Sequence, residues 1–162
     1  MGMKHKMIIR EFKQRISDCH MQNWSQSVND SSRCHYYKLF KTLLNTERYL
    51  SMNLPFKLRI AMSRFRCSSH KLAVETGRHK KIPKELRICQ YCHENRNLNI
   101  VECEYNVFFE CHSFNEIREN YLFNWYRSSK NLQGFINILS SSNDCVLYKT
   151  AIYIEKLLQC SQ

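Results

Sequence analysis

The amino-acid sequence predicts a mainly α-helical domain. Only three glycines and two prolines occur among the 162 residues, so few positions break a helix or favour the turns of an all-β fold. Apolar residues make up 43% of the chain, which is enough to bury a core at the usual length of one domain. Along most of the chain they recur every three or four positions, the spacing of residues on one helix face.

The N-terminal region, residues 1–86, is predicted to be helical and basic. Pro55 suits the first turn of its third helix, and Gly77 suits the C-terminal end of its fourth. The polar stretch 27–33 separates the first two helices. Amphipathic spacing predicts the four helices at residues 3–24, 36–50, 55–66 and 67–79.

The C-terminal region, residues 116–162, is expected to consist of helices as well. Apolar spacing predicts helices at residues 114–125, 132–139 and 144–158. The last has the clearest start, because Asn143 and Asp144 are both good N-cap residues. The segment 87–115 lies between the two helical regions, and all three parts are expected to form one compact domain.

The net charge of +11 is concentrated in one part of the chain. Residues 57–87 hold ten of the 25 Lys and Arg residues, with only Glu75 and Glu85 as acids. Such a density of positive charge is typical of a surface that binds a phosphate backbone. The alternative is a solvated basic face with no partner.

The chain shows no sign of a membrane or secretory protein. Its first residues are charged at close intervals, and no window resembles a signal peptide or a membrane span. We therefore expect an intracellular protein, in the nucleus or cytoplasm, with no membrane partner and with reduced thiols. An odd and clustered set of nine cysteines fits metal binding better than a disulfide framework.

Residues 87–115 are predicted to form a zinc-knuckle-like loop inserted into the helical domain. Cys89 and Cys92 form a C-x2-C pair, whose tight turn can present two sulfurs to one ion. Zinc takes four ligands, and Cys103, Cys111 and His112 are the candidates for the other two. The alternative is that these cysteines are reduced and pack as small apolar residues.

Several motifs also match a known family over roughly residues 10–160. They include "MSRFRCSSHKLAVETGRHKKIPKELRICQYC" at 62–92, "EYNVFFECHSFNEIRENYL" at 104–122 and "YKTAIYIEKLLQ" at 148–159. The most distinctive is R-x-R-x-S-x-H-x-L-x-x-E-x-G-R, formed by Arg64, Arg66, Ser68, His70, Leu72, Glu75, Gly77 and Arg78. With the R-x-C-x-x-C that follows, these motifs resemble the C-terminal region of reverse transcriptases from animal non-LTR (LINE-like) retrotransposons.

The resemblance implies a zinc site that this chain does not fully reproduce. The family continues with E-x-E-[YF]-H-x4-C-P, in which the last cysteine corresponds to Cys111. The family histidine falls on Asn106, whose uncharged, hard amide oxygen is a poor zinc ligand. The implied set is therefore Cys89, Cys92 and Cys111, with no ligand at the fourth position.

Cys103 is the favoured candidate for the missing ligand. It precedes Asn106 by three residues, so in a helical turn the two side chains would be neighbours. The predicted zinc ligands are Cys89, Cys92, Cys103 and Cys111. His112 is the competitor, although adjacent residues such as Cys111 and His112 rarely bind one ion together. A chain that binds no zinc stably is the third outcome.

The resemblance implies a non-catalytic nucleic-acid-binding module of a reverse transcriptase, with a structural zinc. RNA or DNA and the polymerase domain of a reverse transcriptase are the expected partners, and no small-molecule substrate is expected. The residues expected to contact nucleic acid are Arg64, Arg66, His70, Lys71, Arg78, Lys80 and Lys81. The alternative is a relic or domesticated fragment that acts as a structural or protein-interaction domain without zinc.

No catalytic site is predicted. The only aspartates are Asp18, Asp30 and Asp144, so the paired carboxylates of a polymerase cannot be assembled from them. Cys67 and His70 lie close together in sequence, but nothing beyond proximity supports a nucleophile. Geometry separates the two functional hypotheses: one exposed basic face favours nucleic acid, whereas scattered or Glu-paired cations favour a scaffold.

Overall fold

A computed structural model describes residues 2–128 and 130–160 and confirms a mainly α-helical fold. No strand forms in this part of the chain, where Ile88 and Val101 make one isolated antiparallel bridge. The helices are α1 (Gly2–Asp30), α2 (Tyr37–Phe40), α3 (Arg48–Ser51), α4 (Phe56–Arg66), α5 (Ala73–His79), α6 (Gln90–Arg96), α7 (Asn115–Tyr121), α8 (Asn124–Ser128), α9 (Leu132–Leu139) and α10 (Asp144–Cys160). Three further turns are the 3₁₀-helical η1 (Lys84–Leu86) and η3 (His112–Phe114) and the π-helical η2 (Asn106–Glu110).

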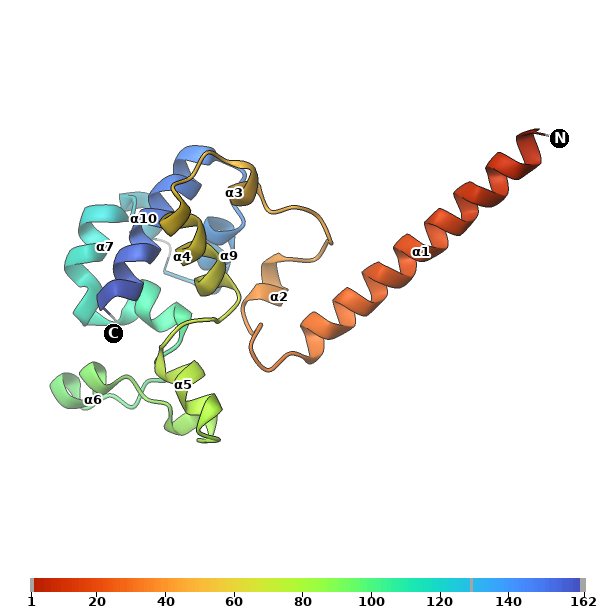
Figure 1. Ribbon diagram of the computed structural model, residues 1–162. Coiled ribbons are helices and arrows are strands. Elements are labelled where there is room, and N and C mark those ends of the chain that lie inside the picture. Colours follow the sequence, from red (N-terminus) through yellow and green to blue (C-terminus); the bar gives the residue numbers. More distant parts are fainter. Residues whose placement is uncertain (1, 129, 161–162) are drawn as a thin grey trace.

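The core lies where α4, α9 and α10 pack around the π-helical turn η2 (Figure 1). Phe108 of η2 is fully buried at its centre. Its ring meets Phe135 of α9 and Tyr153 of α10 edge-on, with centroid distances of 5.2 and 4.9 Å. Edge-to-face pairs of this kind add to the free energy gained by burial. The turn is therefore held by side chains from both C-terminal helices.

The backbone of η2 is fixed by hydrogen bonds from buried side chains. Arg118 donates to the carbonyl oxygens of Phe108 and Cys111, both at 3.0 Å. The hydroxyl of Tyr153 donates to the Phe108 carbonyl at 2.6 Å. A wide π-turn leaves carbonyl groups without their usual helical partners, and these donors satisfy them. The positions of Asn106 and Cys111 at its two ends follow from this network.

α1 extends away from the other helices (Figure 1) and is longer than predicted, with 29 residues. Its apolar side chains, among them Ile8 and Phe12, are exposed. Within the described residues, no helix is both long and apolar enough to cross a membrane.

The second predicted helix, residues 36–50, is wrong as a continuous element. It forms only α2 and α3, with an irregular stretch between them. The buried guanidinium of Arg66 lies between the rings of Phe40 and Tyr49, 4.4 and 5.2 Å from their centroids. The segment wraps around this cation, and Leu43 between the two helices is exposed, so helical spacing of apolar residues was misleading here.

The helices predicted around the basic residues 57–87, which we call the basic segment, also differ in detail. The predicted helix 67–79 begins only at Ala73, because Ser68 has a positive φ of 49° and hydrogen bonds to Glu104. Gly77 lies inside α5 rather than at its end. The predicted helix 114–125 is interrupted after α7. The predictions for α4, α9 and α10 are confirmed, and Asn143 accepts hydrogen bonds from two amides of the first turn of α10.

Gly77 is required by the close approach of Arg87. A Cβ at this position would lie 2.5 Å from Arg87 Cγ. The guanidinium of Arg87 cannot easily move, since it donates to the carbonyl oxygens of Ile82 and Val74, both at 2.9 Å. Gly77 and Arg87 thus join α5 to the chain that leads into Cys89.

We expect Gly77→Ala to destabilise the fold by about 1–3 kcal/mol, as overpacking of a tight contact does. The added methyl displaces Arg87 and its two hydrogen bonds, which outweighs the better helix propensity of alanine. Urea denaturation measures the change. Thr76→Ala, at the exposed neighbouring position, is the control and is expected to stay within about 0.5 kcal/mol of the wild type. A Gly77→Ala chain as stable as the wild type would contradict this account.

Candidate metal centre and basic cavity

Three buried thiols converge from two distant parts of the chain. Cys89 is the N-cap of α6, Cys92 lies in its first turn, and Cys111 directly follows η2. The sulfur of Cys111 is 3.7 Å from the sulfurs of both Cys89 and Cys92. All three sulfurs lie within 4.8 Å of one another, and together they could hold a metal ion. We call Cys89, Cys92 and Cys111 the thiol cluster.

The spacing of the thiol cluster matches a tetrahedral thiolate site. Zinc–sulfur bonds of about 2.3 Å at tetrahedral angles separate the sulfurs by about 3.8 Å. The two observed separations of 3.7 Å are close to this edge length. Two edges of the cluster therefore have the length that a tetrahedral thiolate site requires, and the third, between Cys89 and Cys92, is no longer than 4.8 Å.

The electrostatics of the cluster favour a bound cation. A hydrogen bond with Cys111 lowers the pKa of Cys89 to about 5, so this group is a thiolate at neutral pH. Burial raises the pKa of Cys92. Deprotonation of all three thiols in a buried site thus requires a positive charge among them, which a metal ion provides.

Backbone hydrogen bonds bring the chain back past the C-x2-C pair. Asn97 ends α6 in the left-handed conformation, with a φ of 52°. The amide of Cys89 then donates to the carbonyl of Ile100 at 2.7 Å, and Glu102 donates to the carbonyl of Arg87 at 2.9 Å. This return directs the chain from α6 into η2 and so toward Cys111.

Neither predicted fourth ligand lies with the thiol cluster. The Cys103 sulfur is 3.4 Å from the hydroxyl of Tyr36, which comes from the segment between α1 and α2. His112 is exposed, and its Nδ1 accepts a hydrogen bond from Asn115. The residue that faces the cluster is Asn106, whose side chain contacts the Cys92 thiol. The expectation that Cys103 and Asn106 share one direction is not met in the π-helical turn.

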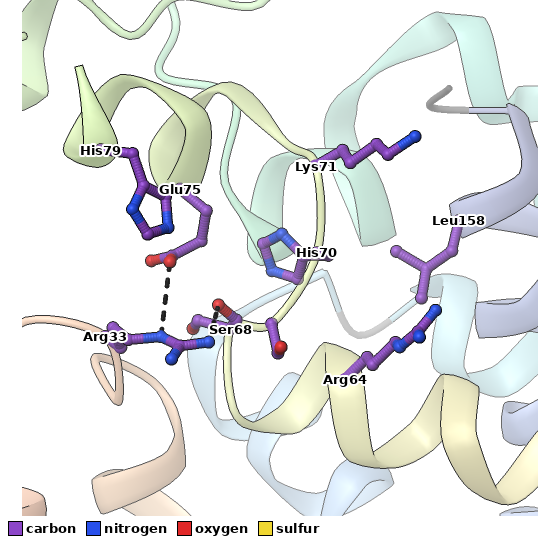
Figure 2. A pocket seen from close by; sticks show the side chains of 9 residues that line it. Arg33, Arg64, Ser68, His70, Lys71, Glu75, His79 and Leu158 are labelled. Carbon is purple, nitrogen blue, oxygen red and sulfur yellow. Dashed lines mark hydrogen bonds and ion pairs between the residues drawn. The ribbon is translucent and has the colours of Figure 1, made fainter.

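A cavity of about 360 Å³ lies beside α4 and α5 (Figure 2). Its lining is rich in basic groups and consists of Arg33, Arg64, Ser68, Ser69, His70, Lys71, Glu75, His79 and Leu158. Figure 2 shows Arg64 and Lys71 on one side and Arg33 and His79 on the other, with His70 between them. The cavity thus gathers cations from three separate segments.

Glu75, which lines this cavity, and Glu104, which binds the lining residue His70, are already paired within the protein. The buried carboxylate of Glu75 lies 3.0 Å from Arg78 and 3.5 Å from Arg33. Residues 67–72 form the loop between α4 and α5. Within it, His70 Nε2 lies 2.9 Å from Glu104 Oε1, and both side chains are buried. Burial acts to raise the pKa of Glu104, but hydrogen bonds from His70 and Ser68 outweigh it, and the pKa is lowered.

The predicted nucleic-acid-binding residues divide into two groups. Arg64, Lys71, Lys80 and Lys81 are exposed, and their side chains form no hydrogen bond or ion pair with any other described residue. Arg66, His70 and Arg78 instead have partners within the fold. Four of the seven side chains are therefore free to meet a partner, whereas the other three are engaged within the fold.

Arg66 is a structural residue in this fold. Its side chain is only 2% exposed and lies 2.8 Å from the carboxylate of Glu47. It also donates to the carbonyl of Leu139, at the end of α9. The guanidinium is buried and both of its terminal nitrogens have protein partners, so this structure gives Arg66 a structural role, and its contact with nucleic acid stays a prediction.

Two acidic residues that were not predicted as site residues organise this region. Glu102 accepts a hydrogen bond from the Ala73 amide at 2.6 Å and so caps the first turn of α5. Glu104 pairs with His70. Both belong to the E-x-E motif after the cysteine pair, and a motif of charged residues beside a predicted metal site was the available signal.

Comparisons with known proteins give no support for the resemblance. No family model, curated protein or solved structure matches the chain. The link to reverse transcriptases therefore stays a prediction from the sequence motifs.

We expect Arg66→Ala to destabilise the fold by about 2–4 kcal/mol, because the Glu47 carboxylate keeps only Lys41 as a cationic partner and the Leu139 carbonyl loses its donor. Arg64→Ala, two residues earlier on the exposed face of α4, is the matched control. Its free energy of unfolding is expected to stay within about 0.5 kcal/mol of the wild type. Chemical denaturation of both variants makes the comparison. Equal stabilities would show that the buried ion pair contributes nothing.

Proposed function

We propose that this protein is a non-catalytic nucleic-acid-binding module whose basic segment is held in place by a structural zinc ion. The observation that carries the proposal is the group of four exposed cations without protein partners, Arg64, Lys71, Lys80 and Lys81. Unpaired cations in a segment that holds ten Lys and Arg residues and two acids over 31 positions are typical of a surface that binds a phosphate backbone.

The cavity supports single-stranded nucleic acid as the ligand. Arg64 and Lys71 stand at one side of it, and His79 lines the other. Lys80 and Lys81 continue directly from His79 at the end of α5. A backbone that crosses the cavity can place successive phosphates against these groups, and the 360 Å³ space accepts a sugar or base turned out of a stack.

The proposed zinc ion has a structural role. Cys111 belongs to the core through η2, whereas Cys89 and Cys92 belong to α6 beyond the basic segment. A metal bound by all three would link α6 to the core at this point. Binding energy at such a site contributes directly to the stability of the region it joins. The motifs favour a reverse transcriptase as the larger protein, whose polymerase domain would then be a further partner.

The first test measures the salt dependence of binding to short single-stranded RNA and DNA of one sequence. Four phosphate contacts predict that log K falls with log salt with a slope of about −3. The double variant Arg64→Gln/Lys71→Gln is expected to reduce this slope to about −1.5, since two contacts are removed. Lys130→Gln removes the same kind of charge from an exposed position that does not line the cavity, and it is expected to leave the slope unchanged. Binding that is insensitive to salt, or a double variant that behaves like this control, would reject the proposal.

The second test measures the zinc content of the purified protein. The wild type is expected to bind one zinc ion per chain. Cys111→Ser is expected to lose it, because the substitution removes one of the three thiol ligands. Cys103→Ser is expected to keep it, since the Cys103 sulfur faces Tyr36. A wild-type chain without zinc would favour a fragment that folds without metal. Zinc loss in Cys103→Ser would show that the ligand set differs from the thiol cluster.

A further inference from the structure

Asn106 is a buried polar side chain without a partner. It is only 1% exposed. Neither Oδ1 nor Nδ2 makes a hydrogen bond of normal geometry with any residue the structure describes. Buried amide groups are almost always hydrogen-bonded, and an exception indicates a missing ligand or a functional role. The two lone pairs of Asn106 Oδ1 therefore accept no hydrogen bond from any described residue.

The backbone directs this side chain toward the thiol cluster. Asn106 begins η2 and Cys111 follows it, joined by a π-helical hydrogen bond of 2.8 Å from the Cys111 amide to the Asn106 carbonyl. One turn therefore supplies both residues. The Asn106 side chain contacts the Cys92 thiol on the other segment. Two of the sulfur–sulfur distances match a tetrahedral thiolate site, and the amide lies beside Cys92, one member of the thiol cluster.

We propose that Asn106 Oδ1 is the fourth ligand of a metal centre with Cys89, Cys92 and Cys111. This inference rests on the proposed function in that it requires a metal to be bound. Three thiolates and one neutral oxygen around a divalent zinc ion leave one net negative charge, compared with two for four thiolates. The remaining Nδ2 group is then placed to donate to a thiolate sulfur, as outer donors commonly do in such sites.

The chemistry of the amide sets the expected affinity. An amide oxygen is harder and less basic than a thiolate or an imidazole, so it binds zinc more weakly. The centre therefore has four ligands, but its zinc affinity is lower than that of a site with four cysteines. A fixed position compensates in part, because Asn106 is buried in the core packing of η2 and no protein group among the described residues competes for its oxygen.

The experiment compares zinc affinity in Asn106→Leu and Asn106→Asp by competition with a chromophoric chelator. Leucine has a similar size but no donor atom, and zinc affinity is expected to fall by about ten- to a hundredfold. Aspartate keeps an oxygen at the same place but has no N–H group, so its affinity is expected to equal or exceed that of the wild type. X-ray absorption on the zinc-loaded wild type is expected to show three sulfurs at about 2.3 Å and one oxygen or nitrogen at about 2.0–2.2 Å.

The outcomes separate this inference from the proposed function. A four-sulfur shell, or zinc affinity unchanged in Asn106→Leu, overturns the role of Asn106 but leaves the zinc site intact. If Asn106→Asp loses affinity as Asn106→Leu does, the amide acts only as a hydrogen-bond donor, and the inference fails. Absence of zinc binding in the wild type overturns both. The absorption measurement needs no variant, so a four-sulfur shell overturns the inference even where a substitution impairs folding.

Discussion

The structure depends most on the meeting of Cys111 with Cys89 and Cys92. α5 and α6 lie beside the bundle of α4, α9 and α10 rather than within it (Figure 1). Cys111 is tied to that bundle, since Arg118 binds its carbonyl and η2 is packed against Tyr153. The two sulfur contacts of 3.7 Å thus connect the exposed basic segment to the core. A metal ion bound here would replace the weak thiol contacts with coordination bonds that hold α6 against η2.

Two acidic residues between Cys92 and Cys111 also hold the basic segment against the core. Glu102 caps α5, and Glu104 binds His70 in the loop before it. Both acids directly precede η2, so one short stretch of chain holds the start of α5, the loop and the thiol cluster together. The four free cations lie on or next to these elements. Their positions are therefore set by polar contacts that are buried, whereas the cations themselves remain in solvent.

The sequence predicted the parts of the fold that local patterns determine. α4, α9 and α10 have regular apolar spacing and clear ends, and their helices agree with the prediction. The stretch 36–50 has similar spacing, yet it wraps around Arg66, a contact with a residue far along the chain.

Three of the four predicted metal ligands converge. Cys103 does not, because the turn after it is π-helical and its sulfur lies beside the Tyr36 hydroxyl, and neither fact is visible in the residue spacing. Composition likewise could not distinguish the buried Arg66 from the exposed Arg64.

The central claim is that a metal in the thiol cluster holds the basic segment in place, and amide hydrogen exchange of the zinc-loaded and chelated protein tests it most directly. Local opening is reported separately for each element by this measurement. We predict that amides of α5 and α6 exchange markedly faster after zinc is removed, while those of α4 and α10 keep their protection, because the bundle packs without the metal. Equal protection of α5 and α6 with and without zinc would contradict the account.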